Sequence, residues 1–383
     1  MTSGAKWESS SYRNEGASEA RKRGLKSIVC ADGGAVIMIG VLCALSVLEP
    51  RRLAAQKKTA EFTRQGLLIT DFAPRGTADL GFGRKAADEV RSRIAKLSNK
   101  REVEVISGGD FRYQLERSGI PDDTILDERT IRQLGRLMRA DEYVLGTVER
   151  APKSVRITGR LILMRDPRLT EPLPSATAPE LGLAVDQFAR AFAAARAELA
   201  PQRRCENALR DAQPERALQA ARDAVAAYPS GVLAHVCLAW ALRATGAPAT
   251  EVLEAARHVL AGDSLNPHGL ESAAIALDSL HRRDESATEW LRLADTDTAN
   301  LELTERVVLS MVYAGNSRRA EPLIVRAAEA HADSLSLRRL EWRVAYENRH
   351  WPVAIKAGED SSLMRSRPHA RRLPSTRRSI AVS

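Results

Sequence analysis

Few residues of this sequence have the types and spacing that catalysis or metal binding requires. The seven histidines are scattered from His235 to His369, and no two have the spacing of a metal-binding pair. The sequence contains no GxxxxGK[ST] phosphate loop, no HExxH or GxSxG motif and no protein-kinase catalytic loop. Asp122 and Asp123 fit an acidic turn after a proline, and Gly81-Phe82-Gly83 is too short for a nucleotide-binding fingerprint. We therefore predict a non-enzymatic protein with no catalytic residue, metal or cofactor.

Two of the four cysteines are candidates for a disulfide bond. Cys30 and Cys43 belong to an apolar segment near the N-terminus, which leaves Cys205 and Cys237. These two are expected on helices that stack as near neighbours, and a single pair is typical of a disulfide in an oxidising compartment. Two independent buried thiols fit the sequence equally well.

The net charge of +9, from 58 basic and 49 acidic residues, is spread thinly along the chain. Dense basic clusters occur only at residues 21–26 and 365–378, and neither cluster is interleaved with the aromatic residues that stack on bases. Solvated terminal segments explain both clusters. We therefore expect no nucleic-acid partner, although a basic cytoplasmic nucleic-acid-binding protein stays open as an alternative.

An apolar, charge-free run covers residues 33–48, directly after the N-terminal basic cluster. It fits either an export signal with a small-residue exit at Ala44-Leu45-Ser46 or an uncleaved single-pass anchor. A buried helix of a soluble domain is a third interpretation. We expect a disordered basic segment at 1–27, the signal or transmembrane helix at 28–48 and a linker at 49–65. The rest of the chain would then lie outside the cytoplasm, either membrane-anchored or periplasmic.

A small α/β sandwich domain is expected at 66–170. Short apolar runs at 67–72, 103–106, 142–148 and 154–164 predict strands, and helical spacing predicts helices at 80–97, 110–115 and 127–139. Ala151-Pro152-Lys153 predicts an antiparallel hairpin between the last two strands. A linking helix is expected to follow at 171–200.

Ordered blocks of this segment resemble a family of bacterial envelope domains. The blocks are Gly66 to Phe72, Leu80-Gly81, Val103 to Ser107, Ala140 to Val148 and Thr158 to Leu161. They are similar to the amino-terminal domain of TolB and to the curli-secretion protein CsgG. A similar domain precedes tetratricopeptide repeats in some bacterial receptor-type kinases and adenylate cyclases. The resemblance implies an assembly or sensing role with no active site.

From residue 201 to 360 the pattern predicts helices only, with regular punctuation. Tyr228, Asp263, Asp297 and Asp333 close successive units, at separations of 35, 34 and 36 residues. A period near 34 is that of tetratricopeptide repeats, which place two antiparallel helices in each unit. We expect helix pairs at 201–228, 231–262, 266–296, 300–332 and 335–359.

Small residues give a second, independent marker of this register. Ala217, Ala287, Ala320 and Ala354 each fall early in an expected second helix, and Val252 stands near the position that they skip. In this repeat family a small residue there lets the two helices cross closely. The aromatic and glycine signatures of the family are reduced to fragments, so a non-repetitive helical bundle stays open.

Five basic residues are candidates for a partner-binding groove. The concave face of such an array is lined mostly by the first helix of each pair, and the candidates there are Arg243, His268, Arg306, Arg338 and Arg343. A basic groove would suit acidic peptide termini.

The sequence as a whole predicts an α+β protein: a hydrophobic N-terminal helix, a small α/β domain, a solenoid of tetratricopeptide-like repeats and a disordered Arg-rich tail at 361–383. The expected function is a protein-interaction scaffold of the bacterial cell envelope, with protein partners and, if the first helix is uncleaved, a membrane contact. A regulatory or sensor ectodomain is the main alternative.

Overall fold

Residues 64–121 and 124–366 are described by the computed structural model. The segments expected at 1–27 and 28–48, all but the end of the linker at 49–65, the pair Asp122-Asp123 and most of the tail at 361–383 lie outside the described residues. Among the residues that are described, no helix is both long and apolar enough to cross a membrane.

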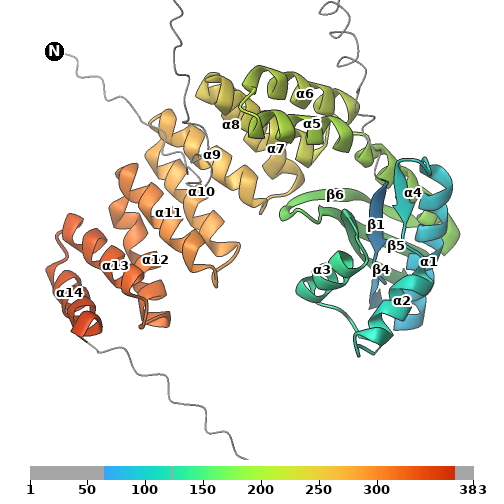
Figure 1. The fold of residues 1–383 in the computed structure, drawn as a ribbon, viewed down its shortest axis with the longest axis horizontal. Coiled ribbons are helices and arrows are strands. Elements are labelled where there is room, and N and C mark those ends of the chain that lie inside the picture. Colours follow the sequence, from blue (N-terminus) through green and yellow to red (C-terminus); the bar gives the residue numbers. More distant parts are fainter. Residues whose placement is uncertain (1–63, 122–123, 367–383) are drawn as a thin grey trace, which may run out of the picture. The chain divides into compact units, whose positions relative to one another are not determined.

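A mixed sheet forms the N-terminal part of the described chain (Figure 1). Its strands are β1 (Gln65–Ile69), β2 (Ala73–Gly76), β3 (Val103–Val105), β4 (Glu142–Ala151), β5 (Ser154–Leu163) and β6 (Asp166–Ala178). They lie in the order β3-β1-β4-β5-β6, and β2 pairs with β4 beyond the end of β1. β3, β1 and β4 are parallel, whereas β5 and β6 are antiparallel to their neighbours. The expected hairpin is the β4–β5 pair.

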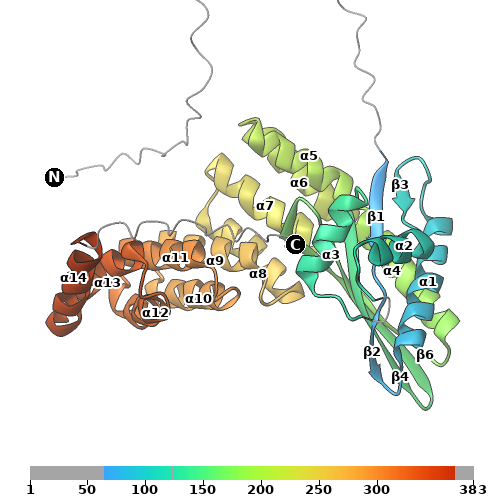
Figure 2. The ribbon, with the colours of Figure 1, turned by 60° about the horizontal axis from the view of Figure 1, so that its bottom comes forward.

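Helices cover both faces of this sheet (Figure 2). α1 (Leu80–Leu97) and α4 (Leu181–Arg196) pack on the face that carries Leu67 and Ile69. α2 (Gly108–Arg117) and α3 (Glu128–Leu137) pack on the opposite face, which carries Leu68. Successive strand residues point to opposite faces, which explains how the apolar run in β1 can serve both layers.

Strand β6 differs from the sequence prediction, which placed the end of this domain at residue 170 and a linking helix at 171–200. The sheet continues to Ala178, and the helix α4 that follows contributes Phe188 and Phe192 to the core of the sheet. The prolines Pro172 and Pro174 argue against a central strand, because proline donates no backbone hydrogen bond. β6 is the edge of the sheet, where one side of the strand needs no partner.

In the part of the chain that the structure describes, ten helices follow α4 in five antiparallel pairs. The pairs are α5 (Leu199–Arg210) with α6 (Pro214–Ala227), α7 (Val232–Thr245) with α8 (Ala249–Gly262), α9 (Pro267–Ser279) with α10 (Arg283–Asp295), α11 (Leu301–Tyr313) with α12 (Ser317–Ala330), and α13 (Leu335–Glu347) with α14 (Trp351–Ser366). The expected repeat arrangement of paired helices is therefore confirmed.

One backbone conformation marks every repeat. The turn inside each pair contains a single residue with positive φ: Ala212, Gly246, His281, Gly315 and Arg349, at φ values of 54°, 72°, 59°, 81° and 60°. The next residue donates a backbone hydrogen bond to a carbonyl in the last turn of the first helix, as in Ala247 to Leu242 (2.9 Å) and Asn316 to Met311 (2.7 Å). This left-handed ending reverses the chain within a few residues. Its recurrence every 34 or 35 residues defines the repeat independently of side chains.

The small residues expected at helix crossings are buried. Ala217, Ala287 and Ala320 are 0% exposed, and Ala354 and Val252 are 4% exposed. Small side chains at these positions allow the two helices of a pair to approach closely, so a much larger side chain would have to push them apart.

Replacing Ala320 by Trp should overfill the crossing between α11 and α12. Overpacking of this kind costs about 1–3 kcal/mol of unfolding free energy, so we expect the melting temperature measured by circular dichroism to fall by several degrees. Ala330→Trp is the matched control, since Ala330 is exposed at the end of the same helix. Equal melting temperatures for the two variants would contradict the register.

Candidate functional site at the junction of the sheet and the repeats

Strand β6 passes along the N-terminal ends of two first helices, α7 and α9. Each helix begins with backbone N–H groups that have no partner within the helix, and these groups favour negative charge. β6 brings Glu171 to the start of α7 and Asp166 to the start of α9. The junction of the sheet and the repeats is therefore built from acidic groups placed at helix N-termini.

The start of α7 differs from the starts of the three later first helices. Asn266, Asn300 and Ser334 cap α9, α11 and α13 with their own side chains. The equivalent residue of α7 is Gly231, which has no side chain to supply. Its place is taken by two glutamates: Glu171 accepts a hydrogen bond from the Leu233 N–H at 3.1 Å, and Glu198 accepts one from the Ala234 N–H at 2.7 Å.

The two glutamates are 1% and 0% exposed and contact each other. A glycine is needed beside them, because a Cβ atom at Gly231 would collide with the Glu198 carboxyl group. Glu171 and Glu198 are not among the predicted site residues, because both lie in the segment expected as a linking helix at 171–200. The available signal was Gly231 itself, a helix start without a capping side chain, whereas α9, α11 and α13 each have one.

Burial raises the pKa of Glu171 to about 7 and the pKa of Glu198 to about 10. The hydrogen bonds with Glu198 and Leu233 oppose the rise at Glu171, and the negative charge of Glu171 adds to the rise at Glu198. At neutral pH the pair therefore keeps a proton, and the protonated carboxyl group can donate to the other. Neither group reaches solvent, so the pair is structural rather than an acid–base pair for a substrate.

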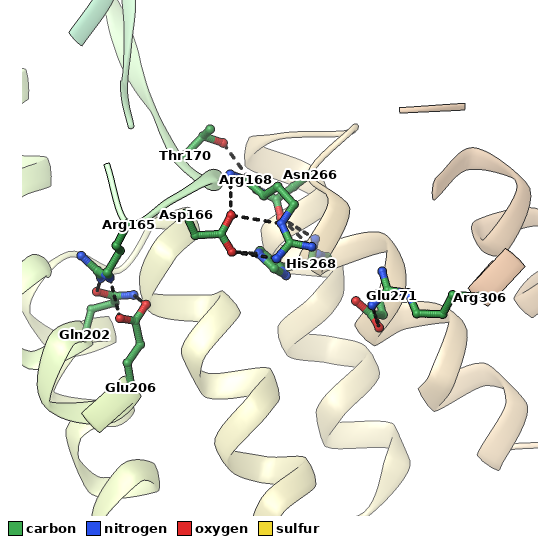
Figure 3. Close-up of polar contacts among 11 residues, drawn as sticks. Arg165, Asp166, Arg168, Thr170, Gln202, Glu206, Asn266, His268, Glu271 and Arg306 are labelled. Atoms are coloured by element: carbon green, nitrogen blue, oxygen red, sulfur yellow. Dashed lines mark hydrogen bonds and ion pairs between the residues drawn. The ribbon is translucent and has the colours of Figure 1, made fainter. Parts of the chain in front are cut away.

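At the start of α9, Asp166 lies between a histidine and an arginine (Figure 3). His268 Nε2 is 3.4 Å from an Asp166 oxygen, and Arg168 donates to both Asp166 oxygens, at 3.0 and 2.9 Å. Burial disfavours the charged form of Asp166, but the hydrogen bonds from His268 and Arg168 outweigh it and hold the pKa below its usual range. Thr170 donates to Asp263 at 2.9 Å, which ties β6 to the loop before α9.

Two further arginines strengthen this region, one by holding α4 to the sheet and the other by holding the sheet to α5. Arg196 of α4 donates to both oxygens of the buried Glu142, at 2.9 and 3.0 Å, and to Gln65 of β1 at 2.8 Å. Arg165, in the β5–β6 turn, donates to Glu206 and Gln202 of α5, at 2.8 and 2.9 Å (Figure 3).

The five predicted groove residues have different surroundings. Arg243 is exposed, and no side-chain ion pair of Arg243 is found in the described part of the chain. Arg306 is 3.2 Å from Glu271 of the preceding first helix, and Arg343 is 3.2 Å from Glu347. His268 and Arg338 are each 6% exposed. Arg338 contacts Glu341 at 2.8 Å and Asp360 at 3.8 Å, while His268 faces Asp166.

The structure therefore does not gather these five residues into one basic groove. The face of the first helices instead carries charges of both signs, with Arg168, Glu271 and Arg306 in sequence along it (Figure 3). His268 and Arg338 are predicted groove residues because they lie on first helices, which were expected to line the concave face. His268 has its acidic neighbour on β6, whereas Arg338 pairs with Glu341 three residues later on the same helix and also lies near Asp360 of α14.

Cys205 of α5 and Cys237 of α7 are joined by a disulfide bond, with their Cα atoms 6.4 Å apart. Both residues are 0% exposed and belong to the apolar cluster between the first two helix pairs. The bond links the first helices of consecutive repeats next to the junction.

A separate cavity of about 200 Å³ lies in the sheet domain. Its wall is mainly apolar, with Asp71, Arg84 and Glu128 among the polar residues. The apolar part of the wall comes from Phe72, Leu80, Phe111, Leu115, Ile125, Leu126, Ile131 and Leu145. Among the described residues, no group of three or more metal-binding side chains is found.

Comparisons with known proteins give fold similarity only. No family model and no curated protein matches the chain. Among solved structures, the chain is similar to PilF of Pseudomonas aeruginosa, with 21% identity over 44% of this chain and 77% of that one and a TM-score of 0.34. It is similar to MamA at 11% identity, over 46% and 97% of the chains, with a TM-score of 0.38. A tetratricopeptide repeat protein of Parabacteroides merdae is 15% identical over 45% and 68%, with a TM-score of 0.36.

The glutamate pair predicts an unusual pH dependence of stability. Because both pKa values are raised above 4.5, the folded protein holds protons that the unfolded chain releases. This contribution to stability is complete below about pH 4.5 and is lost as the pH rises through about 7 and on toward 10. The melting temperature of the wild type should therefore fall from about pH 6 to about pH 9.

Glu198→Gln should flatten this dependence, since glutamine is neutral, can accept from the Ala234 N–H and can donate to Glu171. Glu254→Gln, at an exposed position of α8, is the control and should keep the wild-type slope. Thermal melts at a series of pH values measure how the melting temperature of each variant changes with pH. Identical slopes for wild type and Glu198→Gln would show that the pair holds no proton.

Proposed function

We propose that this protein is a non-enzymatic scaffold of the bacterial cell envelope that binds protein partners along the face of its first helices. The observation that carries this proposal is the series of five helix pairs in one register. Such arrays offer an extended surface on which neighbouring helices each contribute a few side chains to one ligand. The alternating charges of Arg168, Glu271 and Arg306 on adjacent elements supply polar contacts along that surface.

The charges on this face favour a partner segment that carries acidic side chains. Arg243 is exposed, and Arg306 has a side chain that is 45% exposed although it pairs with Glu271. An incoming carboxylate can contact these guanidinium groups with two parallel hydrogen bonds. Because Glu271 already lies on the face, a partner with acidic groups at matched positions is favoured over a uniformly acidic one.

An envelope location is supported by the apolar run at 33–48 and by the Cys205–Cys237 disulfide. Disulfides persist in oxidising compartments and are rare in the cytosol of most organisms. The resemblance of residues 64–170 to the TolB and CsgG domains points to the same location.

Partner binding can be tested with charge-removing variants in the two helix layers. We expect Arg243→Ser with Arg306→Ser to reduce recovery of a specific partner from membranes and periplasm several-fold, since both residues lie on first helices. Arg257→Ser with Arg326→Ser removes the same charge from exposed positions of second helices and should bind as the wild type does. Quantitative mass spectrometry of the captured proteins gives the amount of partner recovered with each variant relative to the wild type. Equal losses in both double variants would show that the partner does not bind on the face of the first helices.

A sensor domain is the second candidate, and the cavity in the sheet domain favours it. An apolar wall with a few polar groups is typical of sites for small amphipathic molecules. Leu145→Trp should fill this cavity and abolish any thermal stabilisation that a small-molecule screen detects in the wild type. A ligand that stabilises both proteins equally binds elsewhere.

A further inference from the structure

The end of the sheet at which β1 begins carries basic side chains without internal partners. β3 starts beside β1 there, with Val103 opposite Gln65, and the connection into β4 lies against Gly66. α1 and α3 also end there, one on each face of the sheet. No hydrogen bond or ion pair of six basic side chains at this end is found in the part of the chain that the structure describes: Lys100, Arg101, Arg136, Arg139, Arg203 and Arg210. Together with Leu97 and Leu137, we call them the entry face.

Carboxylates at the same end of the sheet already have partners within the protein. The pairs are Asp141 with the Gly66 N–H at 2.9 Å, Glu206 with Arg165 at 2.8 Å, Glu104 with Arg64 at 3.9 Å and Glu102 with the Asn99 amide at 2.8 Å. The six basic side chains are not part of these pairs. The entry face therefore attracts anions from outside the molecule.

Helix ends explain only part of this basic character. Arg136 and Arg210 lie in the last turns of α3 and α5, where the helix dipole favours a cation. Lys100, Arg101 and Arg139 lie in connections outside any helix, so the dipoles do not account for them. These three residues come from both sides of β1, which spreads the positive charge over the whole end of the sheet.

Three of the arginines line one cleft of about 380 Å³, namely Arg136, Arg203 and Arg210. The cleft lies between the end of α3, the β5–β6 turn and α5, and Asn207 adds a side-chain amide to its wall. Guanidinium groups bind phosphate oxygens with paired hydrogen bonds. A phosphate group is therefore the anion that suits this cleft.

Two large apolar side chains are exposed on the same face. Leu97, the last residue of α1, is 50% exposed, and Leu137, the last residue of α3, is 66% exposed. Leucine beside arginine and lysine suits the boundary of a bilayer, where the apolar group enters the hydrocarbon edge and the cations contact lipid phosphates. Nucleic acid is less well matched, because bases stack on aromatic side chains rather than on leucine.

The sequence connects the apolar run at 33–48 to this end of the sheet. Leu48 is 16 positions before Arg64, which directly precedes β1. Sixteen residues span at most about 55 Å even when fully extended. A bilayer that holds the apolar run is therefore within reach of the entry face, whereas the opposite end of the sheet is farther away by the length of α1, about 27 Å.

We propose that the entry face lies against an anionic bilayer, with Leu97 and Leu137 at the hydrocarbon boundary and the six basic side chains on lipid phosphate groups. The proposal rests on the envelope location proposed above. It is independent of what the face of the first helices binds.

The test follows one added tryptophan in full-length protein reconstituted with vesicles whose acyl chains carry bromine, which quenches tryptophan only at close range. Leu137→Trp places this tryptophan on the entry face, and the wild type supplies the background from the five native tryptophans. Ile125→Trp is the matched control, because Ile125 is 65% exposed and lies with Thr70 and Ala73 beyond the other end of β1. With phosphatidylglycerol in the vesicles, quenching should be several-fold greater at Leu137→Trp than at Ile125→Trp. With phosphatidylcholine alone it should be small at both.

Charge removal tests the role of the basic side chains in the same assay. Arg101→Gln with Arg136→Gln, added to Leu137→Trp, should reduce its quenching several-fold, and so should high salt. Arg75→Gln with Lys153→Gln removes the same charge from exposed positions of β2 and the β4–β5 turn and should leave the quenching unchanged. Circular dichroism melts of each variant establish that it is folded.

The proposal is wrong if quenching at Leu137→Trp does not exceed that at Ile125→Trp, if phosphatidylglycerol makes no difference, or if both double variants lose quenching equally. An oligonucleotide that binds the wild type but not Arg101→Gln with Arg136→Gln, while Leu137→Trp is not quenched, would assign the face to nucleic acid instead. Partner capture by the first helices is measured separately, so failure of one proposal leaves the other standing.

Discussion

The structure depends on how the first N–H groups of α7 are satisfied. Helix starts leave these groups without intrahelical partners, and burying them unpaired is costly. Three later first helices solve the problem locally with Asn266, Asn300 and Ser334. α7 begins at a glycine instead, and its partners are Glu171 from the edge strand of the sheet and Glu198 from the residue before α5. One hydrogen-bonding requirement therefore holds three separate segments together.

This requirement also explains why the sheet and the first repeats share a core. Once Glu171 and Glu198 meet the start of α7, Val232 and Leu233 lie in the same apolar cluster as Phe188 and Phe192 of α4. Two carboxyl groups can be buried side by side because one of them keeps its proton, which removes the repulsion that two charges would have. The Cys205–Cys237 bond then joins α7 to α5 within the buried cluster between the first two helix pairs. Packing, proton binding and a covalent link thus act on one junction.

The sequence predicted the repeats well and the junction poorly, for physical reasons. The helix pairs follow from local signals that recur at multiples of about 34 residues, including the small residues Ala217, Ala287 and Ala320. Strand β6 was missed because its prolines and its alternating polar residues are compatible with a strand only at a sheet edge, and edge position is a property of the whole sheet. The roles of Glu171, Glu198 and Asp166 depend on contacts between residues far apart in the chain. The burial of His268 and its contact with Asp166 could not be read from the sequence for the same reason, because the two residues lie 102 positions apart.

The glycine at the start of α7 bears on how such a protein can change by recombination. Repeat arrays are often regarded as interchangeable modules that can be joined to new domains at their boundaries. A gene joined just before α5 would lose both glutamates and leave α7 with an unpaired start and a glycine unable to replace them. A transferable unit would have to begin before β6 and carry the edge strand and α4 along. Inheritance of the array is thereby linked to inheritance of the sheet.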